Sequence, residues 1–197
     1  MIHRLMRLAS VATVLVATSA DAKGPYGSIR VGLWTGGTYT NNSTDKFSHC
    51  AAFAPYLSGV VLFVFMEASN SWALGFSHES WELKIGEAFP ITLTFDAQAP
   101  IQVFGRGVTR NLVQVSMPSN SAVMSQFRKA SMMSAFAQGQ LYQFKLDGTS
   151  QLLPTLANCV ASVKSKGIGN VGDFTVTQVA KPAAVAPPGD RRKPQGR

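Results

Sequence analysis

The chain has 197 residues, of which 46% are hydrophobic and 14% are charged. This composition excludes a disordered chain, and the length suits one folded domain with a sizeable core. The net charge is +8, but residues 1–22 carry +1, residues 181–197 carry +4 and the rest of the chain carries +3. Most of the basicity therefore belongs to a C-terminal tail, which argues against an extended basic groove for nucleic acid.

The N-terminal segment has the three parts of a secretory signal peptide. Arg4 and Arg7 give a positive start, Leu8–Ala17 is uncharged and mostly apolar, and Ala20 and Ala22 are the small residues that a signal peptidase reads. The apolar run is too short to cross a membrane as a helix, which needs about 18 residues or more. We expect cleavage after Ala22 and a periplasmic or secreted mature protein with no transmembrane span.

Only Cys50 and Cys159 supply thiols. In an oxidising compartment an even count indicates a disulfide, and only one pairing exists. The alternative is a pair of separate buried thiols. A redox-active pair is disfavoured because neither cysteine lies in a C-x-x-C motif.

Alternating apolar and polar residues between turn signals predict a series of strands. The expected strands are Ser28–Trp34, Phe47–Pro55, Gly59–Met66, Trp72–Phe76, Trp81–Ile85, Phe89–Phe95, Ile101–Phe104 and Asn111–Met117. Between the first two, the Gly- and Asn-rich segment Thr35–Asp45 is expected to be a loop. The turn signals recur about every 8 to 12 residues, which is typical of a sandwich or barrel.

The C-terminal part is expected to add two helices. Residues 119–121 offer N-caps for a short helix that ends at Lys129. The next segment, Met132–Gln138, could extend this helix, but a hairpin with Gln140–Leu146 is favoured. Residues 147–150 then begin a helix that Gly167 ends, with Cys159 on its apolar face.

These elements predict a mainly β fold. We expect an antiparallel sandwich or barrel with a short mid-chain helix and a C-terminal helix packed on the sheet and fastened by the Cys50–Cys159 disulfide. A single domain is expected over residues 23–178. Residues 179–197 are rich in Ala, Pro and basic residues and are expected to be a disordered tail.

Part of the chain, residues 47–161, resembles a known group of exported bacterial proteins. The run from Phe144 to Ser150, the helix with Cys159 that follows it, the earlier Cys50 and the succession Trp72, Trp81, Phe95-Asp96 carry the likeness. Together they are similar to proteins related to the invasion-associated locus B family. This resemblance implies a periplasmic or secreted β-rich domain of the bacterial envelope, with no established catalytic residues to transfer.

Two short motifs lack the context that their chemistry needs. Residues 167–172 match G-x-G-x-x-G, but a helix precedes them, whereas dinucleotide binding requires a preceding strand and a following helix. Residues 43–46 match S-x-x-K but lie in the Gly- and Asn-rich segment, without the further motifs of penicillin-recognising enzymes. We therefore expect no nucleotide and no cofactor.

Histidines and acidic residues do not form a recognisable metal motif. After the signal peptide the only histidines are His49 and His78, with Glu67, Glu79 and Glu82 nearby in sequence. A metal site needs three or four ligands at a recognisable spacing, so no metal and no catalytic residue is assigned. The fold could still bring these residues together in a weak metal or acid–base site.

Four residues are the candidates for ligand contact. Trp72 and Trp81 could line a groove, although aromatic residues in strands more often belong to the core. Arg106 and Arg110 lie in an expected loop and could contact an anion, or they could simply be solvated.

The sequence favours a non-enzymatic, exported binding or structural module of the bacterial envelope. Its partner would be an anionic envelope component or another envelope protein. Two alternatives stay open: an exported hydrolase whose site forms only in three dimensions, and a carrier of a small apolar ligand.

Overall fold

The computed structural model describes residues 23–177. The expected signal peptide and the expected basic tail lie outside these residues. The described strands are β1 (Lys23–Val31), β2 (Trp34–Thr40), β3 (Phe47–Pro55), β4 (Val61–Glu67), β5 (Trp72–Ser77), β6 (Ala88–Phe95), β7 (Ile101–Gly107), β8 (Leu112–Ser116), β9 (Met132–Ala137), β10 (Gln140–Lys145) and β11 (Asp173–Val176). The helices are α1 (Ser121–Lys129), α2 (Thr149–Lys166) and the short 3₁₀ helix η1 (Ile168–Asn170).

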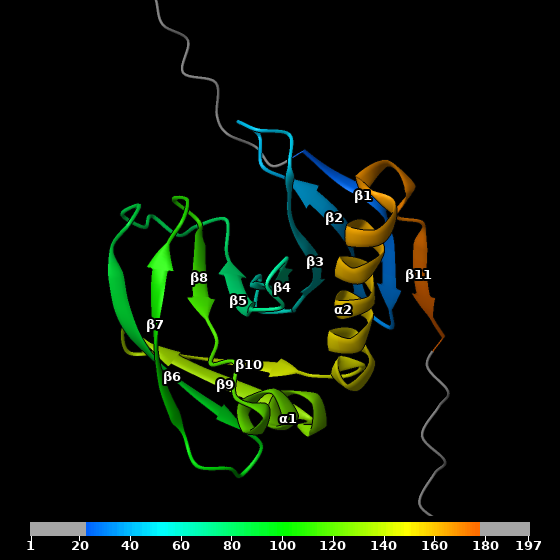
Figure 1. Ribbon diagram of the computed structural model, residues 1–197. Helices are drawn as coiled ribbons and strands as arrows, with labels where there is room; N and C mark the ends of the chain where they lie inside the picture. The colour runs from blue at the N-terminus through cyan, green and yellow to red at the C-terminus, as the bar shows by residue number, and fades with distance from the viewer. Residues whose placement is uncertain (1–22, 178–197) are drawn as a thin grey trace, which may run out of the picture.

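All eleven strands belong to one sheet, in the order β10-β9-β6-β7-β8-β5-β4-β3-β2-β1-β11. Neighbouring strands are antiparallel, except that β11 runs parallel to β1. The sheet curls so that β6–β8 lie opposite β1–β3 and α2, with β9 and β10 below the opening between them (Figure 1). The curl brings β10 back towards β5, where the rings of Phe76 and Phe144 lie 5.5 Å apart.

The two α-helices cover the inner face of the sheet. α2 packs on β1–β4 with an apolar face that includes Leu152, Leu156 and Val160. Asn120 is the N-cap of α1, and its side chain accepts a hydrogen bond from the Val123 amide. The helices contact each other and close the core beneath the curled sheet.

The expected disulfide is present. Cys50 on β3 and Cys159 on α2 are bonded, 109 residues apart in sequence, with Cα atoms 6.3 Å apart. Both are fully buried, and the Thr38 hydroxyl lies 3.2 Å from the Cys159 sulfur. The bond joins the C-terminal helix to the sheet. The structure thus confirms the mainly β class, the mid-chain helix, the packed C-terminal helix and the disulfide. The strands form a single curled sheet.

Three details differ from the expectations. The Gly-rich segment expected as a loop, Thr35–Asp45, contains most of β2, because Gly36 and Gly37 allow neighbouring backbone to approach closely while Trp34, Thr38 and Thr40 are buried. Residues 81–85, expected to form a strand, pair with no described strand and belong to the connection between β5 and β6. The strand β11 was not anticipated; it follows the G-x-G-x-x-G segment and adds to the edge of the sheet beside β1.

Candidate functional site

A cavity of about 330 Å³ opens where the curled sheet approaches β10. Its walls come from β5, β6, β8, β9 and β10 and from the β3–β4 and β5–β6 connections. The apolar and aromatic side chains that line it are Val60, Phe76, Trp81, Leu83, Phe89, Ile91, Val113, Ala135, Ala137 and Tyr142. This size and lining lie within the range of small-molecule sites in proteins.

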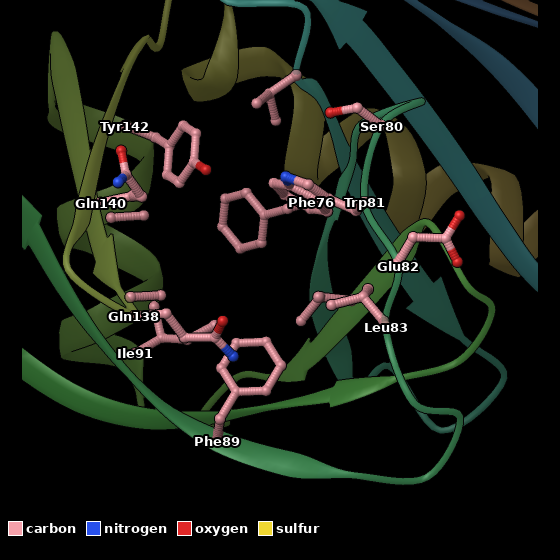
Figure 2. A pocket seen from close by; sticks show the side chains of 14 residues that line it. Phe76, Ser80, Trp81, Glu82, Leu83, Phe89, Ile91, Gln138, Gln140 and Tyr142 are labelled. Carbon is pink, nitrogen blue, oxygen red and sulfur yellow. The ribbon is translucent and has the colours of Figure 1, made fainter.

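The aromatic side chains define the centre of the cavity. In Figure 2 the rings of Phe76, Trp81 and Tyr142 point into it from three different segments. The Trp81 and Tyr142 ring centroids lie 5.9 Å apart in an edge-to-face arrangement. Edge-to-face aromatic pairs of this kind present large apolar area with few rotatable bonds, which suits a ligand surface.

The β5–β6 connection, residues 78–87, is held in place by backbone hydrogen bonds. The Leu83 amide donates to the Arg110 carbonyl at 2.7 Å, and the Gly86 amide donates to the Gly107 carbonyl at 2.7 Å. His78 accepts from the Ser80 amide and stacks on Trp81 at 5.9 Å. These contacts fix Trp81 and Leu83 against the cavity although the segment is not a strand.

The opposite wall is the β9–β10 hairpin. Its two-residue turn consists of Gln138 and Gly139, both with positive φ, as the tightest hairpins require. On β9 the inner face carries Ala135 and Ala137, whose small side chains leave the space that forms the cavity. Tyr142 on β10 fills part of that space and directs its hydroxyl into it (Figure 2).

The polar residues of the cavity lie at its rim. Ser80, Glu82, Gln138 and Gln140 complete the lining, and only Glu82 among the lining residues is charged. Its carboxylate points away from the aromatic rings (Figure 2). The arrangement can enclose an apolar group and offer amide and hydroxyl groups around it.

Of the predicted tryptophans, the structure brings only Trp81 to the cavity. Trp72 is 2% exposed and packs on Phe127, and its indole Nε1 donates to the Pro118 carbonyl at 3.1 Å. Trp34 is equally buried. Both serve the core, as aromatic residues in strands commonly do.

The two predicted arginines support the cavity from outside. Arg106 on β7 donates from Nη1 to the Gly86 carbonyl at 3.0 Å, and it lines a separate hollow on the outer face of the sheet beside Phe104. Arg110 lies in the β7–β8 turn, where its backbone carbonyl accepts the hydrogen bond from the Leu83 amide. Neither side chain lines the cavity.

The groups with shifted pKa values lie away from the cavity. Burial lowers the pKa of His49, and the Glu67 carboxylate partly opposes this. Burial, together with Asp147, raises the pKa of Tyr56 to about 12, and burial also raises the pKa of Tyr39. Within residues 23–177, no group of three or more His, Cys, Asp or Glu side chains could hold a metal ion.

Sequence reasoning missed most of the cavity wall, including Leu83, Ala137 and Tyr142. The alternation of Trp81 and Leu83 correctly indicated that both side chains face the same side. It did not show that their segment remains unpaired. Nothing in the spacing of Ala135 and Ala137 distinguishes a cavity wall from a packed core.

No protein-family model and no curated protein matches the sequence. Among solved structures, the chain is similar to invasion associated protein B from Bartonella henselae, with 14% sequence identity and a TM-score of 0.47. The alignment covers 71% of this chain and 99% of that chain. Over residues 23–177, neither α-helix is both long and apolar enough to cross a membrane.

Proposed function

We propose that this protein is an exported, non-enzymatic binding protein that encloses an apolar group in the cavity between the β5–β6 connection and the β9–β10 hairpin. The observation that carries the proposal is the cavity itself, about 330 Å³ in volume and lined mainly by apolar and aromatic side chains. Enclosing an apolar group there removes its surface and that of the walls from water, which is favourable by about 25 cal/mol per Å².

Export rests on the sequence of residues 1–22 and is consistent with the buried disulfide. The three-part signal pattern directs the chain to the periplasm or the medium. Disulfides persist mainly in such oxidising compartments. We place the protein in or outside the bacterial envelope, as the resemblance of residues 47–161 implies.

The binding proposal is tested with N-phenyl-1-naphthylamine, an apolar dye whose fluorescence rises in apolar surroundings. We expect saturable binding that quenches tryptophan emission, and this quenching should be smaller in Trp81→Phe because Trp81 is the tryptophan that lines the cavity. Trp34 and Trp72 are buried in the core and supply the tryptophan emission that remains in this variant.

Two matched variants on β9 separate the cavity from the rest of the surface. Ala137→Phe places a ring in the cavity, and the loss of apolar burial should weaken dye binding about tenfold or more. Ser134→Phe adds the same ring on the outer face of β9 and should leave the affinity within about twofold. Equal effects of the two variants would refute the cavity as the binding site.

A further inference from the structure

The strand that forms one wall of the cavity is also an edge of the sheet. β10 pairs with β9 on one side, and no described strand pairs with it on the other. An edge strand presents a row of unpaired backbone N–H and C=O groups that can pair with another chain. The cavity and this open edge therefore adjoin along Gln140 and Tyr142.

The register identifies which backbone groups point outward. The Leu146 amide donates to the Ser131 carbonyl at 2.9 Å, and Lys145 is opposite Met132. In an antiparallel pair, residues facing the partner alternate with residues facing away. Counting back from Leu146, the backbone groups of Lys145, Gln143 and Leu141 face away from β9.

One independent contact supports this assignment. The hydroxyl of Tyr56, which lies in the β3–β4 connection, donates to the Lys145 carbonyl. That carbonyl therefore does face away from β9. Tyr56 closes the edge at this end, whereas Leu141 and Gln143 are exposed, Leu141 by 60%.

The side chains of β10 alternate between the two faces of the sheet. Gln140 and Tyr142, whose backbone groups face β9, direct their side chains to the face that carries the cavity. A strand added beside β10 would pair with Leu141 and Gln143 through its backbone. Its residue opposite Tyr142 would then place a side chain on the cavity side of the sheet.

We propose that the ligand of the cavity is an extended polypeptide segment that adds to the sheet beside β10 and inserts one aromatic or large aliphatic side chain into the cavity. Backbone pairing supplies affinity in this mode, and the cavity selects the side chain. The rim amides of Gln138 and Gln140 suit the polar backbone on either side of the inserted residue. This inference rests on the proposed function and specifies its ligand class.

The test uses the full exported protein and capped peptides of about seven residues, Thr-Gln-Thr-X-Thr-Gln-Thr, with Phe, Trp, Leu or Ser as X. Binding is measured by calorimetry, and amide exchange of the protein is followed residue by residue by NMR. We expect the Phe, Trp or Leu peptide to bind at least about tenfold more tightly than the Ser peptide. The bound peptide should slow exchange at Leu141 and Gln143 about tenfold.

Two changes remove the backbone pairing and leave the cavity intact. Gln143→Pro deletes an outward amide, a substitution that edge strands tolerate, and should weaken peptide binding about tenfold while dye binding is unchanged. Gln143→Ala keeps the amide and should bind the peptide normally. A peptide N-methylated at the residues flanking X should lose affinity for the unaltered protein to a similar extent.

Three outcomes overturn the inference. Dye binding without binding of any peptide refutes the peptide ligand while leaving the proposed function standing. Failure of both dye and peptides refutes both. Slow exchange at Leu141 and Gln143 before peptide is added shows that the edge is already paired, which also overturns the inference.

Discussion

His49 is a half-buried titratable side chain that packs between aromatic rings on the outer face of the sheet. Its ring stacks on Tyr39 at 5.3 Å and meets Phe65 edge-to-face at 5.3 Å, and its Nδ1 lies 2.9 Å from the Ser48 hydroxyl. Burial lowers its pKa below 6.5, against a smaller opposing effect of Glu67. Folding therefore favours the neutral imidazole.

This shift makes stability depend on pH in a definite direction. Between the lowered folded pKa and the unfolded value of 6.5, the unfolded chain binds more protons, so the free energy of unfolding falls as the pH falls through this window. We expect His49→Phe, which keeps an aromatic ring between Tyr39 and Phe65, to lose less stability between about pH 7 and pH 5.5 than the unaltered protein. Urea unfolding at the two pH values measures this, and identical losses would show that His49 does not contribute.

At the scale of the single element, β2 depends on glycine for its place in the sheet. A Cβ atom added at Gly36 would lie 2.0 Å from the Ala51 carbonyl oxygen on β3. Backbone atoms cannot yield as a flexible side chain can, so the two strands would have to separate. The same residue type that made this segment resemble a loop is what lets it pack as a strand.

Gly36→Ala should accordingly destabilise the fold by about 3 kcal/mol, the upper part of the usual range for overpacking. Gly169→Ala is the matched control, since an added Cβ there meets no atom within 4 Å; we expect it to change stability by less than about 0.5 kcal/mol. Urea unfolding of both variants gives the comparison. If Gly36→Ala is as stable as the control, the close approach of β2 to β3 is not a constraint on this fold.

At the scale of the whole molecule, a measurement of the intact mass tests both the disulfide and the removal of residues 1–22. The exported protein should have the mass of a chain that begins at Lys23, because cleavage is expected after Ala22. Reduction should add the mass of two hydrogen atoms, since Cys50 and Cys159 are the only cysteines. Intact-mass spectrometry decides both points, and a mass that includes residues 1–22 would contradict the proposed export.

The same bond closes a loop of 109 residues. For a loop of that length the chain-entropy relation gives a stabilisation of about 5 kcal/mol. This is comparable to the total stability of many small domains. The pairing could be predicted from the sequence because only two thiols exist and the N-terminal signal pattern predicts export to an oxidising compartment.

Local patterns in the sequence were sufficient for most of the fold. Alternation located β3 to β8 and the β9–β10 hairpin, whereas N-cap residues located α1 and the helical spacing of apolar residues up to Gly167 located α2. They were not sufficient for β2 or β11, nor for the unpaired residues 81–85, because pairing depends on what lies beside a segment in space. The short parallel contact of β11 with β1, for example, joins the two ends of the described chain.

The candidate site was harder to predict than the fold. Its walls come from segments as distant in sequence as Val60 and Tyr142, and no two of them form a chemical motif. Trp81 was among the expected contact residues and does line the cavity. Arg106 and Arg110 do not line it but form hydrogen bonds to the β5–β6 connection, which contains Trp81. An apolar cavity has no spacing rule of the kind that metal ligands have.

The cavity and the disulfide occupy different halves of the curled sheet. α2 and the Cys50–Cys159 bond secure β1–β4, while the cavity is built largely from residues of β5, β6, β8, β9 and β10 and of the β5–β6 connection. Substitutions at those strand ends can alter the shape of the cavity without disturbing the cross-linked half. Evolution can thus change the ligand specificity of such a protein through single substitutions at the cavity rim. The cross-linked half then keeps its sequence and preserves the fold.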